Sequence, residues 1–296
     1  MPREPRMSTN TYVLITPARN EATTISKTLD AVCAQSVKPL EWIIVSDAST
    51  DDTDSIVTSY TVQYPFIRLL RVERSGGRTF GAKARAFRRG YEALSTASYE
   101  YIGNLDADVS FQPEYFETLL DRFNADPLLG ISGGMIWDCL GSRIRPLNEA
   151  DHSVAGAVQL FRRACFESIG GYMELPGGID AIAEHAARSK GWRTRSFPEL
   201  QVLHFRPVGS AGQSAWRAAF RQGMNQRRFG WMPWYVLARA PFRWRDRPLF
   251  LATILRTTGY FWAMLKREPC MIPDDLRAFI RTEQSSMLRR RVSDSK

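Results

Sequence analysis

The chain has few of the residues that build disulfide frameworks and zinc sites. It contains only three histidines and four cysteines, and the cysteines, Cys33, Cys139, Cys165 and Cys270, include no C-x-x-C pair. The sequence therefore predicts neither a structural zinc site nor a set of disulfides, and a reducing compartment such as the cytoplasm is favoured.

Long apolar runs are also lacking. Residues 1–10, MPREPRMSTN, have no apolar segment of the kind found in signal peptides, and we expect this stretch to be disordered. The most apolar segment, residues 249–265, contains Arg256 and is shorter than the roughly 20 residues that span a bilayer. It predicts a core helix or a helix that lies on a surface.

Acidic residues are scarce near the carboxyl terminus. Residues 216–296 contain 17 Lys and Arg against 6 Asp and Glu, a net charge of +11, together with five of the eight tryptophans. Residues 1–215 contain 23 Lys and Arg against 25 Asp and Glu, a net charge of −2. Basic side chains interleaved with aromatics are typical of proteins that bind nucleic acid or an anionic membrane surface. Because no zinc finger or RNP motif accompanies them, we expect a membrane surface rather than nucleic acid. The alternative is that these helices pack on the rest of the chain and the arginines are solvated.

Strand-like and helical patterns alternate through the first 124 residues. Apolar runs at residues 12–17, 41–46, 67–72 and 101–105 predict strands, and helical spacing follows at residues 23–35, 52–64, 81–94 and 112–124. Successive βαβ units of this kind predict an α/β fold with a mostly parallel sheet.

The pattern is looser after residue 124. We predict a strand at 129–137, an irregular stretch to residue 148, a strand or short helix at 153–161, a helix at 182–190 and a strand at 201–205. From about residue 214 the chain becomes rich in Arg and Trp and is interrupted by prolines, which predicts a separate helical extension over 214–296.

Two aspartates follow the strand at 101–105, in the sequence G-N-L-D-A-D-V. Asp is a common turn residue, so a D-x-D triplet by itself is weak evidence for a site. The carboxyl ends of strands in open α/β sheets are where ligands bind, however, and Pro113 suits a first helical turn just after the pair. Asp106 and Asp108 therefore predict a divalent cation held between protein and phosphate.

Polar loops follow the first two strands at the same predicted edge. The first strand ends in T-P-A-R-N-E and the second in S-D-A-S-T-D-D-T. Asp47 lies at the strand tip, where its carboxylate could accept hydrogen bonds from a base or ribose. Asp51 and Asp52 immediately precede a helix, and N-capping is the simpler interpretation of both.

Seven motifs occur in order between residues 12 and 206. They are P-A-R-N-E, V-S-D-A-S-T-D-D-T, G-A-K-A-R-A-F-R-R-G, N-L-D-A-D-V, I-G-G-Y, G-I-D and V-L-H. In this order and spacing the sequence resembles the family 2 inverting glycosyltransferases of the GT-A fold. The resemblance implies a GT-A catalytic domain over residues 11–213, with a mostly parallel central sheet flanked by helices.

The resemblance also implies roles for individual residues. Asp47 would contact the base of a nucleotide sugar, although Ser46 and Ala48 replace the family's Asp and Gly on either side. Lys83 would meet the diphosphate, Asp106 the ribose or a metal-bound water, and Asp108 a divalent cation, Mn²⁺ or Mg²⁺, with His204 completing the metal or diphosphate site. The remaining donor-binding positions implied are Pro17, Arg19 and Glu21.

The family's catalytic base is the aspartate of an E-D pair, and that position matches Asp180, with Ile179 in place of the Glu. Glu184, one helical turn further on, is an alternative acid. Asp180 could instead simply cap the helix that follows Gly177 and Gly178. Inverting transfer requires a carboxylate to deprotonate the acceptor hydroxyl while the nucleoside diphosphate leaves from the opposite face.

We therefore expect an enzyme that transfers a sugar from a nucleotide-diphospho-sugar to a glycan or lipid-linked acceptor, in cell-surface polysaccharide or glycolipid synthesis. It would act in the cytoplasm, peripherally on the inner face of the cell membrane. A metal-dependent nucleotidyltransferase is an alternative, but it would favour a glycine-rich loop where this chain has T-P-A-R-N-E. A nucleic-acid-binding protein that uses the basic extension is a second alternative.

Overall fold

The computed structural model describes residues 10–73, 81–140, 143–146, 152–206, 215–243 and 250–293. The chain divides into two compact units, residues 1–207 and residues 208–296. The predicted disorder at the amino terminus falls almost wholly on residues outside the described ranges.

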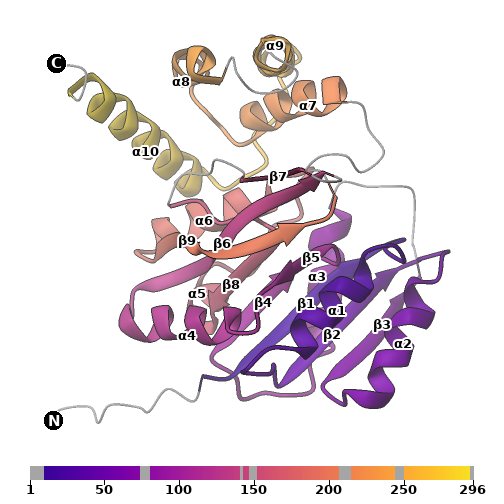
Figure 1. Cartoon of the computed structure of the whole chain (residues 1–296). Helices are drawn as coiled ribbons and strands as arrows, with labels where there is room; N and C mark the ends of the chain where they lie inside the picture. Colours follow the sequence, from indigo (N-terminus) through magenta and orange to yellow (C-terminus); the bar gives the residue numbers. More distant parts are fainter. Residues whose placement is uncertain are drawn as a thin grey trace, which may run out of the picture. The chain divides into compact units, whose positions relative to one another are not determined.

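The first unit contains a nine-stranded sheet in the described part of the chain (Figure 1). Its strands are β1 (Tyr12–Ala18), β2 (Glu41–Asp47), β3 (Ile67–Val72), β4 (Tyr101–Leu105), β5 (Val109–Phe111), β6 (Leu129–Leu140), β7 (Arg143–Pro146), β8 (Val158–Arg162) and β9 (Arg193–His204). They are ordered β3-β2-β1-β4-β8-β6-β9-β5, with β7 paired to β6. Only β5, β7 and β8 run against the other six, so the sheet is mostly parallel, as predicted.

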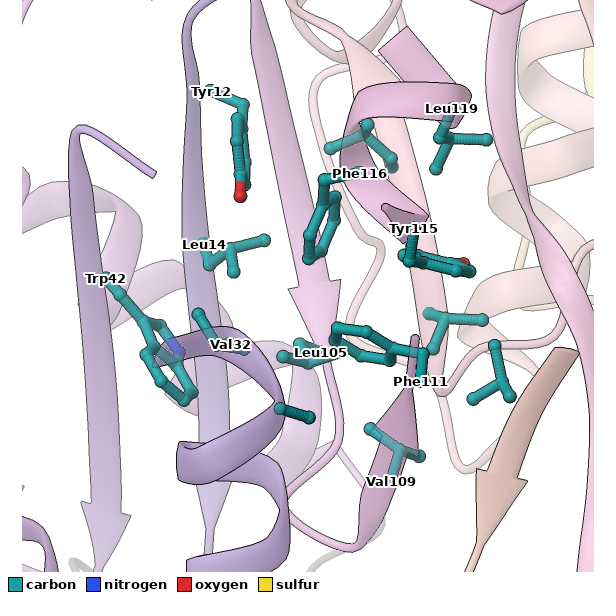
Figure 2. Close-up of a cluster of buried hydrophobic side chains, with 14 of the residues drawn as sticks. Tyr12, Leu14, Val32, Trp42, Leu105, Val109, Phe111, Tyr115, Phe116 and Leu119 are labelled. Carbon is teal, nitrogen blue, oxygen red and sulfur yellow. The ribbon is translucent and has the colours of Figure 1, made fainter. Parts of the chain in front are cut away.

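Helices cover both faces of this sheet, as Figure 1 shows. They are α1 (Ile25–Cys33), α2 (Thr53–Gln63), α3 (Ala82–Glu92), α4 (Tyr115–Ala125), α5 (Arg163–Ser168) and α6 (Ile179–Ser189). Strand residues alternate between the two faces. Figure 2 shows Tyr12 and Leu14 of β1 on the same face as Trp42, where they meet Val32 of α1 and Phe116 of α4.

The opposite face of β1 and β2 packs closely against α3. A Cβ added at Gly90 would lie 2.6 Å from Ile15 and 2.9 Å from Val45, so the helix backbone approaches the strands more closely than any side chain would allow. Phe87 of the same helix extends this layer, with its ring centroid 5.8 Å from that of Phe166 in α5. The position of α3 matters because it carries Lys83 to the carboxyl edge of the sheet.

The structure differs from the sequence prediction at several connections. Residues 109–111 form β5, and α4 begins only at Tyr115, so Pro113 precedes the helix rather than starting it. Part of the stretch predicted to be irregular forms β7, and the ambiguous segment 153–161 contributes the strand β8. The last strand, β9, begins eight residues earlier than expected.

The second unit is helical in its described residues. Its helices are α7 (Ala215–Arg228), α8 (Pro233–Arg239), the 3₁₀ helix η1 (Ala240–Arg243), α9 (Leu251–Leu265) and α10 (Asp274–Ser293). A Cβ on Gly223 of α7 would collide with the carbonyl of Arg256, and one on Gly259 of α9 with the carbonyl of Phe220. These two glycines therefore let α7 and α9 pack backbone to backbone. Among the described helices, none is both long and apolar enough to cross a membrane.

Candidate active site

The predicted site residues gather where the sheet changes direction. Strand β4 pairs in parallel with β1 on one side and antiparallel with β8 on the other. The register places Ile15 beside Asn104, so the loops after both strands leave the same edge. A change in strand order or direction leaves a crevice at the carboxyl ends, which is the usual ligand-binding position in such sheets.

Asp108 lies in a buried cluster at this edge. Its Oδ1 is 3.4 Å from Nε2 of His204, and its Oδ2 is 3.9 Å from Nε of Arg206. Arg206 also donates from both terminal nitrogens to the two carboxylate oxygens of Glu21. The cluster thus joins two predicted site residues from the start of the unit, Glu21 and Asp108, to the segment after β9.

His204 is held between two carboxylates. Its Nδ1 lies 3.0 Å from Oδ1 of Asp138 on β6, opposite the contact with Asp108. Burial lowers the pKa of His204, but the adjacent carboxylate of Asp108, with smaller contributions from Asp138 and Asp106, leaves it raised to about 9. Asp138 fixes the orientation of the ring, as a carboxylate behind a ligating histidine commonly does.

Asp108 and His204 fit a divalent cation. The Oδ1 of Asp108 is buried and has no hydrogen-bond partner among the described residues, which leaves a carboxylate oxygen available beside an imidazole nitrogen. No group of three or more His, Cys, Asp or Glu side chains suited to a metal occurs in the described ranges. Asp108 and His204 would supply two ligands to a cation, with phosphate oxygens or water as the others.

Lys83 and Asp106 form a second cluster next to the first. The Nζ of Lys83 is 2.5 Å from Oδ1 of Asp106 and donates a 3.1 Å hydrogen bond to the carbonyl of Gly156. Burial lowers the pKa of Lys83, but the carboxylates of Asp106, Asp180 and Asp108 outweigh it and raise the pKa above its usual value. Lys83 therefore carries a firmly held positive charge among three carboxylates.

Asp180 shares a pocket with Lys83. The pocket measures about 240 Å³ and is lined by Lys83, Asn104, Gly156, Tyr172, Gly177, Gly178, Ile179 and Asp180. Gly178, with φ of +66°, is the N-cap of α6, and no side chain caps this helix. Asp180 lies in the first turn of this helix, where its negative charge also interacts favourably with the helix dipole. Its side chain lies against Gly156, where an added Cβ would be 2.6 Å from Oδ2.

Glu184 lies one turn further along α6 and does not line this pocket. It is buried, its Oε1 accepts a 2.7 Å hydrogen bond from the amide of Val154, and its Oε2 is 3.5 Å from Arg188. Burial raises the pKa of Glu184 to about 8, against the opposing effects of Val154 and Arg188. The geometry favours a structural role over the alternative acid suggested by the sequence.

Asp47 lies at the end of β2, with one carboxylate oxygen 3.9 Å from Nη1 of Arg19. The next residue, Ala48, has φ of +51°, the left-handed conformation that glycine adopts most readily. The backbone at this departure from the family motif therefore keeps a glycine-like shape. Asp51 hydrogen-bonds the amides of Thr53 and Ala22, in agreement with a capping role, whereas Asp52 makes no side-chain cap.

Pairwise contacts join the predicted site residues into three neighbouring groups. The first contains Glu21, Asp108 and His204, and the second Lys83, Asp106 and Asp180. The third contains Arg19 and Asp47, the last residue of β2. Pro17 lies within the neighbouring β1, in register with Val45 of β2. Sequence reasoning missed Arg206, Asp138 and Asn104. Arg206 lies only two residues after V-L-H, so its charge beside that motif was a usable signal. Asp138 and Asn104 lie within strands and carried no such signal.

Comparison with known proteins identifies the family. The glycosyl transferase family 2 model matches residues 13–191, and the chain belongs to this family. It is 31% identical over 121 residues to the uncharacterized glycosyltransferase YibD of Escherichia coli, covering 41% of this chain and 33% of that protein. It is 25% identical over 232 residues to poly-beta-1,6-N-acetyl-D-glucosamine synthase of Staphylococcus aureus, covering 70% of this chain and 53% of that protein.

A solved structure shares the fold. The mannosyltransferase PcManGT from Pyrobaculum calidifontis, in complex with GDP-Man and Mn²⁺, matches with a TM-score of 0.53 and 19% identity, covering 94% of this chain and 80% of that one. This likeness establishes the GT-A fold. The chain spans only about a third to a half of the length of the curated relatives it matches.

Proposed function

We propose that this chain transfers a sugar from a nucleotide-diphospho-sugar to an acceptor hydroxyl with inversion, using Asp180 as the base. The observation that carries this proposal is the pocket in which Asp180 faces the same space as Lys83, whose ammonium group is bonded to Asp106. The reaction requires a carboxylate that deprotonates the acceptor and a positive charge that stabilises the anionic leaving group. Asp180 and Lys83 provide these two groups in one pocket. Family membership favours this function over nucleotidyl transfer.

In this proposal, each residue of the site has a separate role. Asp180 takes the proton from the acceptor hydroxyl as its oxygen attacks the anomeric carbon. Lys83 places a positive charge where the diphosphate gains negative charge, and Asp47 accepts hydrogen bonds from the base, with Pro17, Arg19 and Glu21 shaping the same end of the site. Asp108 and His204 would hold a divalent cation, Mn²⁺ or Mg²⁺, which when bound neutralises charge on the leaving diphosphate.

The replacement Asp180→Asn tests this assignment, because it keeps the side-chain shape and removes the base. We expect the affinity for UDP and GDP sugars to stay within about threefold, while transfer falls by at least about 100-fold. Donor binding is measured by calorimetry, and transfer by release of the nucleoside diphosphate in the presence of acceptor. Asp121→Asn, at an exposed position on α4, is the matched control. Near-normal transfer by the Asp180 variant would exclude it as the base.

We further propose that the second unit docks on an anionic membrane surface and brings the active site to a lipid-linked or membrane-assembled glycan. Its net charge of +11 suits anionic lipid headgroups. Large apolar side chains on it are exposed: Trp216, Trp234, Leu237, Phe250, Ile254, Phe261, Trp262, Met264, Leu265 and Met271. The described residues of the first unit expose only Leu40, Val62, Leu128 and Ile144 in this way, so the apolar exposure is concentrated where the positive charge is.

Three of the exposed apolar side chains of α9 lie along one stripe. Ile254, Phe261 and Leu265 are spaced by seven and four residues, which places them on one side of a helix. The small residues Ala252, Gly259 and Ala263 lie on the other side, the side that packs on α7. Helix α9 is therefore apolar on a packed face and on an exposed face, the arrangement expected of a helix that rests on the acyl boundary of a bilayer.

A further inference from the structure

The pocket beside Asp180 contains a buried hydrogen-bond acceptor with no partner. Asn104, on β4, is 2% exposed, and no described residue donates to its Oδ1. Its Nδ2 donates a 2.5 Å hydrogen bond to the carbonyl of Gly156, and this bond fixes which end of the amide is the oxygen. A buried acceptor without a partner is costly, so one in the lining of a pocket indicates a ligand group that satisfies it.

The neighbouring side chains restrict what that ligand group can be. The phenol of Tyr172 donates its hydrogen to Oε1 of Gln159, 2.7 Å away, and Lys83 is directed to Asp106 and Gly156. An amide oxygen bonds only to a donor, so a phosphate or carboxylate oxygen is excluded at this position. Water, hydroxyl and amide N–H groups remain, and the last two are the groups that a sugar or N-acetylamino sugar ring presents.

We propose that Asn104 accepts a hydrogen bond from one hydroxyl or acetamido N–H of the sugar being transferred, and so selects the donor sugar. The inference rests on the proposed function. It assigns the sugar ring to the space between Lys83, at the diphosphate, and Asp180, at the attacking hydroxyl. Sites that hydrogen-bond a substrate group discriminate strongly against analogues lacking that group, because the protein partner is then left unpaired.

The first test uses the wild-type chain and chemically altered donors. Binding of UDP, GDP, UDP-N-acetylglucosamine, UDP-glucose and GDP-mannose is measured by calorimetry, and the tightest sugar nucleotide is then compared with analogues in which each hydroxyl, or the acetamido group, is replaced by fluorine. Fluorine cannot donate a hydrogen bond. We expect the loss of one group to weaken binding about tenfold, by leaving Asn104 unsatisfied.

The second test repeats the series with Asn104→Leu, which keeps the approximate shape and removes the acceptor. We expect UDP and GDP to bind within about twofold of wild type, the intact sugar nucleotide to bind about tenfold more weakly, and the sensitive fluorine substitution to have no further effect. Asn124→Leu is the matched control, since Asn124 contacts Tyr101 at the opposite end of β4. Melting curves establish that both variants fold.

The outcomes separate the two proposals. If no nucleotide or nucleotide sugar binds, the proposed function fails. If nucleotide sugars bind but no fluorine substitution weakens wild-type binding, or the sensitive substitution costs the Asn104 variant as much as wild type, only the role of Asn104 is overturned. The wild-type series decides the question even if the variant does not fold.

Discussion

At the scale of single residues, the carboxylates of the site differ in how closely each is paired with a basic side chain. Glu21 is neutralised by Arg206 and Asp106 by Lys83, whereas Asp108 keeps one buried oxygen without a hydrogen-bond partner among the described residues. The contacts of Asp108 with His204 and Arg206 are longer, at 3.4 Å and 3.9 Å, so we expect an added cation to bind at this carboxylate.

The change Asp108→Asn tests this expectation by removing the charge and keeping the shape. We expect Mn²⁺ affinity, measured by electron paramagnetic resonance in the presence of UDP or GDP, to fall at least about tenfold, and sugar transfer to fall with it. Asp121→Asn should leave both unchanged. Full transfer activity of the wild-type chain in excess chelator would show that the reaction does not need the metal.

At the scale of elements, α6 is fixed by buried polar contacts as well as by apolar packing. Gln159 of β8 lies opposite Asn104 in the strand register, donates to the carbonyls of Val154 and Asp180, and accepts from Tyr172. Glu184 adds a bond to the amide of Val154. Together these contacts join the first turns of α6, which carry Asp180, to β8 and the segment before it.

Because Glu184 has a raised pKa, this attachment should depend on pH. The folded chain holds a proton on Glu184 up to about pH 8, whereas the unfolded chain releases it near pH 4.5, so the stabilising contribution is complete below pH 4.5 and is lost as pH rises toward 8. The charge of Asp180 contributes to this shift, and that of Arg188 opposes it.

The change Glu184→Gln should therefore flatten the pH dependence of stability. We expect its melting temperature to gain several degrees relative to wild type between pH 5 and pH 8, which corresponds to a difference on the order of a few kcal/mol. Calorimetric melting at half-unit pH intervals measures this, with Glu114→Gln, an exposed position, as the control. Parallel curves for wild type and the Glu184 variant would contradict it.

The elements that sequence reasoning recovered are those with a visible apolar period. The strands β1 to β4 and helices α1 to α3 were predicted to within a few residues because most of them carry a visible apolar pattern: β1, β2 and β4 are continuous buried runs, and α1 and α3 bury one helical face. The start of β9 was missed because its buried positions are polar: the hydroxyls of Thr194 and Ser196 donate to the carbonyls of His152 and Ser153. The strand β5 has only three residues, too few to show a period.

The site residues also divide into those with a local sequence signal and those without one. Those that lie at or just after strand ends, such as Asp47 and Asp108, could be predicted because a carboxylate there has few structural reasons to be present. Asn104 and Asp138 could not be predicted, since each lies within a strand and is oriented by a partner from a distant part of the sequence, Gly156 and His204 respectively. Their importance depends on tertiary geometry that no local pattern contains.

At the scale of the whole molecule, charge and apolar exposure are both unequal between the two units. If the second unit docks on lipid, the full chain should sediment with vesicles containing phosphatidylglycerol and stay in the supernatant with purely zwitterionic vesicles. Binding should weaken as salt is raised, because each basic residue contributes about 1 kcal/mol near an anionic surface and this attraction is screened.

The double variant Ile254→Ser and Leu265→Ser tests the apolar part of this surface. We expect its vesicle affinity to fall at least about fivefold, with sugar transfer to a water-soluble acceptor unchanged. Val62→Ser with Leu128→Ser, which removes two exposed apolar side chains from the first unit, is the matched control. Equal recovery of all proteins in the supernatant would exclude the membrane, and concentration-dependent dimerisation in ultracentrifugation would assign the surface to a second copy.

The ion pair between Glu21 and Arg206 also has a consequence for synthesis of the protein. The two residues are 185 positions apart, and at translation rates of about 5–20 residues per second the ribosome needs about 10–40 s to add Arg206 after Glu21. Once Asp108 has been added, about halfway through that interval, the nascent chain contains β1 to β4 and the carboxylates of Glu21 and Asp108, but neither Arg206 nor His204. The charge balance around Glu21 and Asp108 is therefore completed only after the last strand of the sheet has been synthesised.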